Sequence, residues 1–238
     1  MEILLLFSLV AFLYASVGHG GASGYIALMA IFAFPNNEIR SNALFLNLFV
    51  SFISFTHFFN KQDFPFKLFF ILILSSIPMA FFGGMGNLDS RWYKIILGLI
   101  LCIPILKFLG FFPKIQFQIK QNLLLVIILG LAIGLLSGLL GIGGGIILSP
   151  ILILFGWCTV KQTAAVSAIF IFVNSLAGLL GKSFSSLQFS ENILQILVFT
   201  LIGGFLGGFF GAKKFKVQMI QYMLAFVLLI ACFKLFNT

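Results

Sequence analysis

The sequence predicts an all-α integral membrane protein built from two homologous helical repeats, on three observations. Hydrophobic residues make up 61% of its 238 residues and charged residues only 8%, whereas a soluble domain carries about 25% charged residues. The apolar runs are continuous rather than alternating, which indicates transmembrane helices and not a transmembrane barrel. The run Gly18-His19-Gly20-Gly21-Ala22 is answered 123 positions later by Gly141-Ile142-Gly143-Gly144-Gly145, which indicates duplication.

The expected helices follow from the apolar segments. Six segments approach the ~20 residues needed to cross the hydrocarbon core. Three shorter ones, 3–17, 22–34 and 145–156, border the glycine runs, and 122–140 ends on the second run. Each repeat is therefore interpreted as a Gly-broken helical pair followed by three long helices, with repeats at 1–115 and 116–238 in one compact transmembrane domain. The ten segments are 3–17, 22–34, 41–59, 66–86, 92–112, 122–140, 145–156, 164–181, 191–210 and 217–236.

The orientation of the repeats depends on the broken pair. A pair that crosses as one broken span gives parallel repeats, and a hairpin that returns to its own side gives inverted repeats. The hairpin interpretation places nine basic residues on one side and five on the other, while the broken span divides them seven to seven. Because basic residues collect on the cytoplasmic side, we expect inverted repeats with both termini outside. Trp92 and Trp157 lie beside loops and are interpreted as interfacial anchors.

The glycine runs are candidate anion-binding elements. A Gly-rich break leaves backbone N–H groups free at the start of the following helix, where the helix dipole adds partial positive charge. Backbone at membrane depth must be buried in protein or line a wet cavity. The alternative is close helix packing, in which glycine only removes bulk. Inverted repeats with broken helices that meet near the midplane are a common transporter design.

Polar residues in the helices after each pair add to this candidate site. Asn47 and Ser51 are four residues apart, and Ser167 and Asn174 are seven apart, so each pair shares a helix face. They could bind substrate or form hydrogen bonds between helices. His19 replaces the aliphatic residue of the second run and could supply positive charge, relay a proton, or be a hydrogen-bonded neutral imidazole.

The cations at the starts of these helices, Arg40 and Lys161, could draw anions or only set topology. The net charge of +9 is spread over short loops, so no nucleic-acid partner is expected. A stripe of glycines from Gly203 to Gly211 predicts a helix contact face, inside the monomer or in a homodimer.

No enzyme constellation is present. The chain has no nucleotide-binding loop and no carboxylate pair, and its five acidic residues fall at segment ends. The three cysteines have no metal-ligand spacing and are interpreted as packing residues. We therefore expect no catalytic residue, metal or cofactor, and transport must be driven by an ion gradient or by the substrate gradient.

The second run carries a family resemblance. Leu140-Gly141-Ile142-Gly143-Gly144-Gly145-Ile146-Ile147-Leu148-Ser149-Pro150, followed by Ala164-Ala165-Val166-Ser167 and Phe172-Val173-Asn174-Ser175, resembles the TauE/SafE (sulfite exporter, TSUP) family over the whole chain. The first run departs from the motif at His19. The resemblance implies a bacterial inner-membrane permease that exports small sulfur-containing anions such as sulfite or organosulfonates.

These observations predict a secondary anion transporter that works by alternating access around a midplane site. The alternatives are a passive anion channel and a non-transporting membrane partner or sensor subunit. The expected partners are a small anion, the lipid bilayer and a second copy in a homodimer. The expected substrate-binding residues are Gly18, His19, Gly20, Gly21, Ala22, Asn47, Ser51, Gly141, Ile142, Gly143, Gly144, Gly145, Ser167 and Asn174.

Overall fold

A computed structural model of the chain describes residues 1–89, 119–184 and 187–213, and the single positions 92, 95, 96, 98, 99, 102, 106, 222 and 229. This part contains eight helices and no strand, and five of the helices are long and apolar enough to cross a membrane: α3, α4, α6, α8 and α9. The helices are α1 (Glu2–Ala15), α2 (Ala22–Ile31), α3 (Asn36–Phe58), α4 (Phe66–Met85), α6 (Leu123–Leu140), α7 (Gly145–Leu154), α8 (Val160–Ser183) and α9 (Ile193–Lys213).

The helices match the expected segments, with earlier starts for α3 and α8. Helix α3 begins at Asn36, directly after Pro35, so its first turn is polar and hydrophobicity alone misses it. Helix α8 begins at Val160 behind a capping box, in which Thr159 and Gln162 satisfy each other's backbone N–H groups. The predicted helices at 92–112 and 217–236 lie largely outside the described residues.

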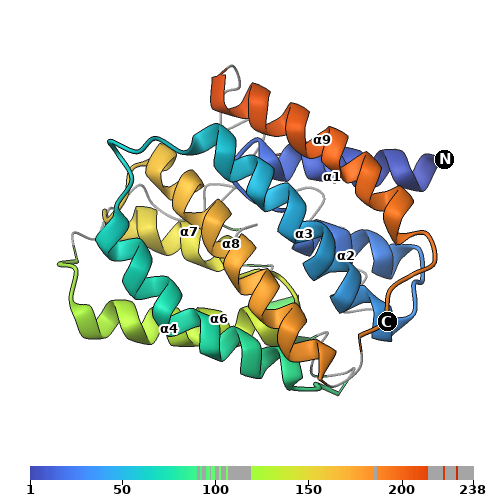
Figure 1. The fold of residues 1–238 in the computed structure, drawn as a ribbon, viewed down its shortest axis with the longest axis horizontal. Coiled ribbons are helices and arrows are strands. Elements are labelled where there is room, and N and C mark those ends of the chain that lie inside the picture. Colours follow the sequence, from blue (N-terminus) through green and yellow to red (C-terminus); the bar gives the residue numbers. More distant parts are fainter. Residues whose placement is uncertain are drawn as a thin grey trace.

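The long helices form a layered bundle around α3 and α8 (Figure 1). Helices α1 and α9 lie on one side of this central pair, and α4 and α6 lie on the other. Leu44 of α3 faces Gly178 of α8, and the ring of Phe52, further along α3, is 5.4 Å from that of Phe172, earlier in α8. Helices α3 and α8 are therefore antiparallel. Helices α3 and α8 are also the most buried of the five long helices.

Small residues bring the outer helices together. Gly203, Gly207 and Gly211 of α9 lie against the backbone carbonyls of Ser8, Phe12 and Ser16 along α1. In the same way, glycines of α6 lie against the carbonyls of Ser76 and Ala80 on α4. The predicted glycine contact face therefore packs inside the monomer.

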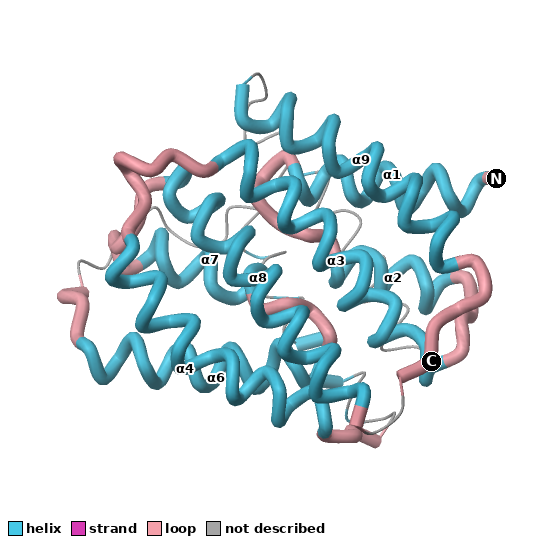
Figure 2. Tube along the Cα trace, in the orientation of Figure 1, coloured by secondary structure: helices cyan, strands magenta, loops and turns pink. Residues whose placement is uncertain are grey.

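Each Gly-broken pair is a hairpin that returns to the end of the bundle where it began. In the first, the Tyr14 hydroxyl is 2.8 Å from Ser23 Oγ, and the Phe7 ring lies 6.5 Å from that of Phe34, beyond the end of α2. In the second, Trp157 Nε1 donates to the Ile119 carbonyl at 2.7 Å and so joins its two ends. Figure 2 shows the two connecting loops in the interior of the bundle, and the broken-span alternative is wrong.

The two ends of the bundle are each tied by hydrogen bonds between distant segments. At one end, here called the Asp63 end, Gln162 Nε2 donates to the Asp63 carbonyl at 2.7 Å. At the other, the Gln188 end, Asn37 Nδ2 donates to Gln188 Oε1, and the Ser190 N–H donates to Asn42 Oδ1 at 3.2 Å. The Asp63 end therefore joins a loop of the first half of the chain to helix α8 of the second, and the Gln188 end joins helix α3 of the first half to a loop of the second.

Candidate functional site

The two glycine runs form the hairpin tips, and each tip packs against the long central helix of the other half of the chain. A Cβ placed on Gly18 would lie 2.5 Å from Ala164 Cβ of α8. A Cβ on Gly141 would lie 2.7 Å from Cγ of Arg40 on α3. The tip of the first hairpin therefore packs against α8 of the second half of the chain, and the tip of the second hairpin packs against α3 of the first half.

The two tips meet at the side-chain amide of Asn47. Gly20 lies against its Oδ1 and Gly143 lies against its Nδ2, so closely that a Cβ at either position would overlap the amide. Asn47 Oδ1 accepts from the Ala22 N–H at 3.2 Å, and Nδ2 donates to Ser175 Oγ of α8 at 2.9 Å. The side chain is 0% exposed. One buried amide thus joins both tips to both central helices.

A second polar group lies at the first tip. His19 Nε2 is 3.0 Å from Ser149 Oγ of α7, which is 2.7 Å from Ser167 Oγ of α8. His19 Nδ1 is 3.1 Å from the Val17 carbonyl. The imidazole is half-buried, whereas the glycines beside it are buried. A titratable ring is therefore connected to a chain of two hydroxyls inside the bundle.

Several buried backbone donors at the tips have no acceptor in the part of the chain that the structure describes. The N–H groups of Gly143, Gly144, Gly145 and Ile146 form no hydrogen bond to any residue that the structure describes, and those of Gly20 and Gly21 are in the same state. Helices α2 and α7 start here without a side-chain cap. Buried N–H groups are nearly always paired in proteins, so these donors indicate a place for a ligand with several acceptor oxygens or for water.

Two of the predicted polar residues bond to their own helices. Ser51 Oγ donates to the Leu48 carbonyl at 3.1 Å, and Asn174 Nδ2 donates to the Phe170 carbonyl at 2.9 Å. Asn174 Oδ1 is buried without a hydrogen-bond partner among the described residues. The structure brings Asn47, Ser167, His19, Ala22 and the glycines of both runs together at the tips. Ile142 is buried in the hydrophobic cluster that also contains residues of α1 and α2.

Sequence reasoning left three residues of this region out of the predicted set. Ser175 accepts a hydrogen bond from Asn47, and Ser149 shares one with Ser167. The Tyr25 hydroxyl holds the first tip in place by donating to the Gly20 carbonyl at 2.9 Å. Ser149 stands in a short apolar helix beside Pro150, and a polar residue there was the available signal. Ser175 lies directly after Asn174 and was visible as polar, but only the helix crossing shows that it faces Asn47.

Two basic residues of α3 and α8, Arg40 and Lys182, are buried, whereas exposed loop cations were expected. Arg40 is 7% exposed and donates to the carbonyls of Gly83, Gly84 and Gly86 at 2.6–2.8 Å. It therefore caps the C-terminus of α4. Lys182 is 6% exposed. Lys161 is exposed, as expected of a loop-flanking cation.

Two loop residues are also more buried than their positions suggest. Trp157 is buried, and its indole closes the second hairpin instead of standing free as an interfacial anchor. Cys158 in the same loop is buried, and this burial raises the pKa of its thiol to about 11. The neutral thiol fits the predicted packing role. The described residues contain no cluster of metal-ligating side chains.

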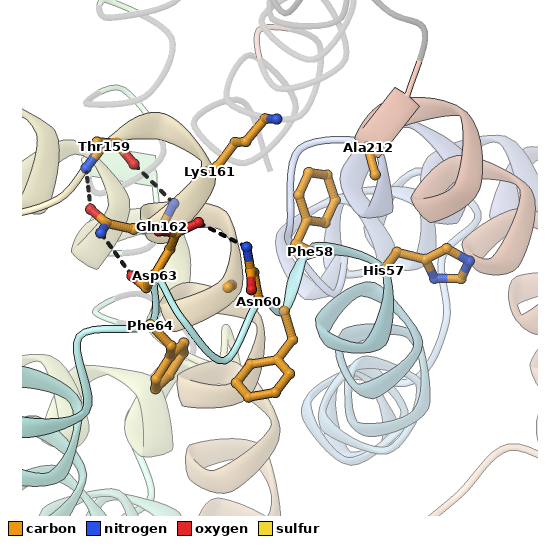
Figure 3. Close-up of a pocket in the computed structure, with 11 residues that line it drawn as sticks. His57, Phe58, Asn60, Asp63, Phe64, Thr159, Lys161, Gln162 and Ala212 are labelled. Carbon is orange, nitrogen blue, oxygen red and sulfur yellow. Dashed lines mark hydrogen bonds between the residues drawn. The ribbon is translucent and has the colours of Figure 1, made fainter.

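A separate cavity of about 450 Å³ lies at the Asp63 end of the bundle (Figure 3). It is bordered by the end of α3, the start of α8 and the end of α9, with His57, Lys161 and Ala212 among its lining residues. The Gln162 and Asn60 side chains both bond to Asp63 at one edge. Ala165 also lines it and adjoins Ala164, against which the first tip packs. The cavity therefore lies on the Asp63 side of the hairpin tips.

Comparison with known proteins places this bundle among membrane transporters. A family model described as "Sulfite exporter TauE/SafE" matches residues 3–235. The chain belongs to the TauE/SafE family of membrane transporters. It is a multi-pass membrane protein and not an enzyme.

Curated relatives agree with this class. "Probable membrane transporter protein y4hK" of Sinorhizobium fredii is 30% identical over 240 aligned residues, which cover 96% of this chain and 95% of that protein. "Probable membrane transporter protein MamO" of Paramagnetospirillum magneticum is 32% identical over 101 residues, which cover 40% of this chain and 16% of that protein. No solved structure matches the chain.

Proposed function

We propose that the protein is a secondary carrier of small sulfur-containing oxyanions, such as sulfite or organosulfonates, which bind between the two hairpin tips. The carrying observation is the convergence of Gly20 and Gly143 on Asn47, beside buried N–H groups that have no acceptor among the described residues. A sulfonate or sulfite presents three oxygens to such donors. The starts of α2 and α7 add partial positive charge on either side of it.

The proposed donors suit an anion that must shed water. Backbone N–H groups and an amide bind an oxyanion without a fixed cation, so the free energy of binding stays moderate and the ligand can leave. The Asn47 amide is held in place by Ala22 and Ser175, which preorganises the site. The description of the family as sulfite exporters supports the sulfur oxyanion as the substrate class.

Inverted repeats, 1–115 and 116–238, form the proposed moving halves. The packing supports this arrangement, because exchanging the halves turns the α4–α6 contact into the α9–α1 contact and the α2–α3 contact into the α7–α8 contact. The opposite directions of α3 and α8 fit a two-fold axis in the membrane plane. With the basic side facing the cytoplasm, both termini lie outside the bacterial inner membrane.

Alternating access would proceed by rocking one half against the other around the tips. The hydrogen bonds that tie the halves at the Asp63 end and at the Gln188 end are placed to close either side in turn. A carrier of this kind cannot conduct ions freely. This property separates it from a passive anion channel that shares the same glycine-lined tips.

Reconstitution of the purified full-length chain into liposomes tests the proposal. We expect saturable uptake of at least one anion among sulfite, sulfoacetate, thiosulfate and methanesulfonate, accelerated by the same anion inside, with chloride and acetate as comparison anions. Carriers show this exchange stimulation and channels do not. Ionic conductance without exchange stimulation would instead identify the protein as an anion channel. Failure to bind or move any sulfur oxyanion would reject the proposed function.

A further inference from the structure

We propose that Asn174 selects singly protonated oxyanions, so that the carrier binds hydrogensulfite in preference to the sulfite dianion or a sulfonate. This inference rests on the proposed anion site and names the form of the substrate that fits it. It is carried by a buried acceptor, Asn174 Oδ1, which faces the second hairpin tip and has no donor among the described residues.

The orientation of the Asn174 amide is fixed by one hydrogen bond. Its Nδ2 donates to the Phe170 carbonyl at 2.9 Å. A carbonyl oxygen can only accept, so the nitrogen of the amide and not its oxygen must occupy this position. The remaining atom, Oδ1, is therefore an acceptor, and the side chain is 0% exposed. An acceptor buried in this way costs free energy until a donor reaches it.

The neighbours of Asn174 on α8 place it against the second tip. A Cβ on Gly144 would lie 3.0 Å from Cε1 of the Phe170 ring, four residues before Asn174. A Cβ on Gly145 would lie 2.3 Å from Cδ1 of Ile171, three residues before it. Residues three and four apart share a helix face. Asn174 therefore continues the face of α8 on which the second tip packs.

The second tip supplies hydrogen-bond donors to the same region. The N–H groups from Gly143 to Ile146 have no acceptor among the described residues. Ser137 Oγ of α6 is buried and also has no partner there, and Ser137 Cβ would lie 3.3 Å from a Cβ on Gly144. A helical serine can bond to its own preceding turn, as Ser51 does. The Ser137 hydroxyl makes no such bond, so the tip offers backbone donors, a hydroxyl and one acceptor.

A singly protonated oxyanion satisfies both kinds of group. Hydrogensulfite has one negative charge, oxygens that accept from the tip N–H groups, and one O–H that can donate to Asn174 Oδ1. A sulfonate or the sulfite dianion has only acceptor oxygens and would turn a lone pair toward Oδ1. A site built to bond to a ligand O–H rejects the analogue without it, because the buried protein group is then left unpaired.

The alternative is a site that presents only donors, with a water molecule satisfying Asn174 Oδ1. Such a site prefers the ligand without the hydrogen, because the ligand O–H would lose its hydrating water and find no acceptor. The two explanations therefore predict opposite preferences for a pair of ligands that differ by one hydrogen.

Methylphosphonate and methanesulfonate form this pair. In mildly acidic buffer each has one negative charge, one methyl group and three oxygens, and only methylphosphonate carries an O–H. Binding to the purified full-length protein is measured by calorimetry, together with sulfite, which is mostly hydrogensulfite in the same buffer. We expect methylphosphonate to bind at least about tenfold more tightly than methanesulfonate.

Two leucine variants assign the preference to Asn174. Asn174→Leu keeps a branched side chain and removes the acceptor. Binding of methylphosphonate and of sulfite should weaken at least about tenfold, while that of methanesulfonate stays within about threefold. Asn42→Leu is the matched control, because Asn42 is a buried asparagine of the other central helix with an unpartnered amide nitrogen, at the Gln188 end. It should keep the wild-type preference.

The outcomes are distinct. If the wild type binds the two probes equally, or methanesulfonate more tightly, this inference is overturned and the proposed anion site remains. A preference or a sulfite affinity that persists in Asn174→Leu also overturns it. If that variant does not fold, Asn174→Ala takes its place, and the sign of the wild-type preference still decides between the two explanations. A wild type that binds neither sulfite nor either probe overturns the proposed anion site and this inference together.

Discussion

The side-chain amide of Asn47 donates to the hydroxyl of Ser175 at 2.9 Å, joining the central helix of the first half of the chain to that of the second. The same amide accepts from the Ala22 N–H and lies against Gly20 and Gly143. A single residue of α3 therefore sets the relative positions of both hairpin tips and of α8. A change of charge at Asn47 should accordingly alter anion binding between the tips.

Asn47→Asp should weaken anion binding strongly while the protein still folds. The carboxylate has the shape of the amide and can still accept from the Ala22 N–H, but it places negative charge between the tips. We expect at least a tenfold loss of sulfonate affinity in titrations of the purified protein. Asn42→Asp, at the Gln188 end where Asn42 accepts from the Ser190 N–H, is the control. Equal binding by Asn47→Asp and the wild type would place the anion elsewhere.

Gly143→Ala should impair both stability and transport, and Gly156→Ala provides a matched control. Both glycines have left-handed backbone, with φ of 72° and 68°, so alanine strains each by about 1 kcal/mol. Only at Gly143 would the added Cβ meet a neighbour, since nothing lies within 4 Å of a Cβ at Gly156.

We expect Gly156→Ala to lower the melting temperature slightly and to keep transport. Gly143→Ala should lose a further 1–3 kcal/mol, roughly, because the Asn47 amide must move or lose its bonds. Melting in detergent and liposome flux measure the two effects. Matching values for the two variants would show that the close approach to Asn47 has no functional role.

The interior hairpins and their glycine tips were predictable from sequence because the signal is local. A glycine run interrupts an apolar stretch, and the apolar segments beside it are too short to cross the membrane. The helix must therefore be broken inside the membrane. The duplicated spacing and the bias of loop charges then favoured hairpins over broken spans, and the structure shows hairpins. Asn47 and Ser167 could be selected because polar side chains on apolar helices are few.

The partners of these residues were not predictable because they depend on how helices rotate and cross. On α8, Ser175 rather than the predicted Asn174 bonds to Asn47, and the rotation of α8 decides this. Ser149 joins the His19 group only because α7 folds back beside the first tip. Arg40 lies near a helix start in the sequence, yet it reaches the end of α4, 43–46 residues away.

Replacing Arg40 should reduce stability rather than substrate recruitment. Its guanidinium bonds to three carbonyls at the end of α4, and one lysine ammonium cannot span them. We expect Arg40→Lys to lose about 1.5–3 kcal/mol of stability with little change in the salt dependence of transport. Lys161→Gln, at an exposed position, should leave the melting temperature unchanged. A large salt-dependent change in KM for Arg40→Lys, with normal melting, would assign it to anion recruitment instead.

Weakening the hydrogen bonds at the two ends should shift the carrier in opposite directions. Gln162→Ala removes the bond to the Asp63 carbonyl, and Asn37→Ala removes the bond to Gln188. Each bond contributes about 1 kcal/mol, so its loss should change the ratio of the two access states about fivefold. The reporter is Ala165→Cys at the wall of the Asp63-end cavity, labelled by a membrane-impermeant maleimide after the three native cysteines are replaced by serine.

The labelling rate should rise about fivefold in Gln162→Ala, because the Asp63 end opens more often. It should fall in Asn37→Ala, because opening of the Gln188 end draws the population away. Thr159→Ala removes a capping hydroxyl from Gln162 but leaves its bond to Asp63, so it controls for local loosening of α8 and should leave the rate unchanged. Rates that change in the same direction in Gln162→Ala and Asn37→Ala would show that the two ends do not open in alternation.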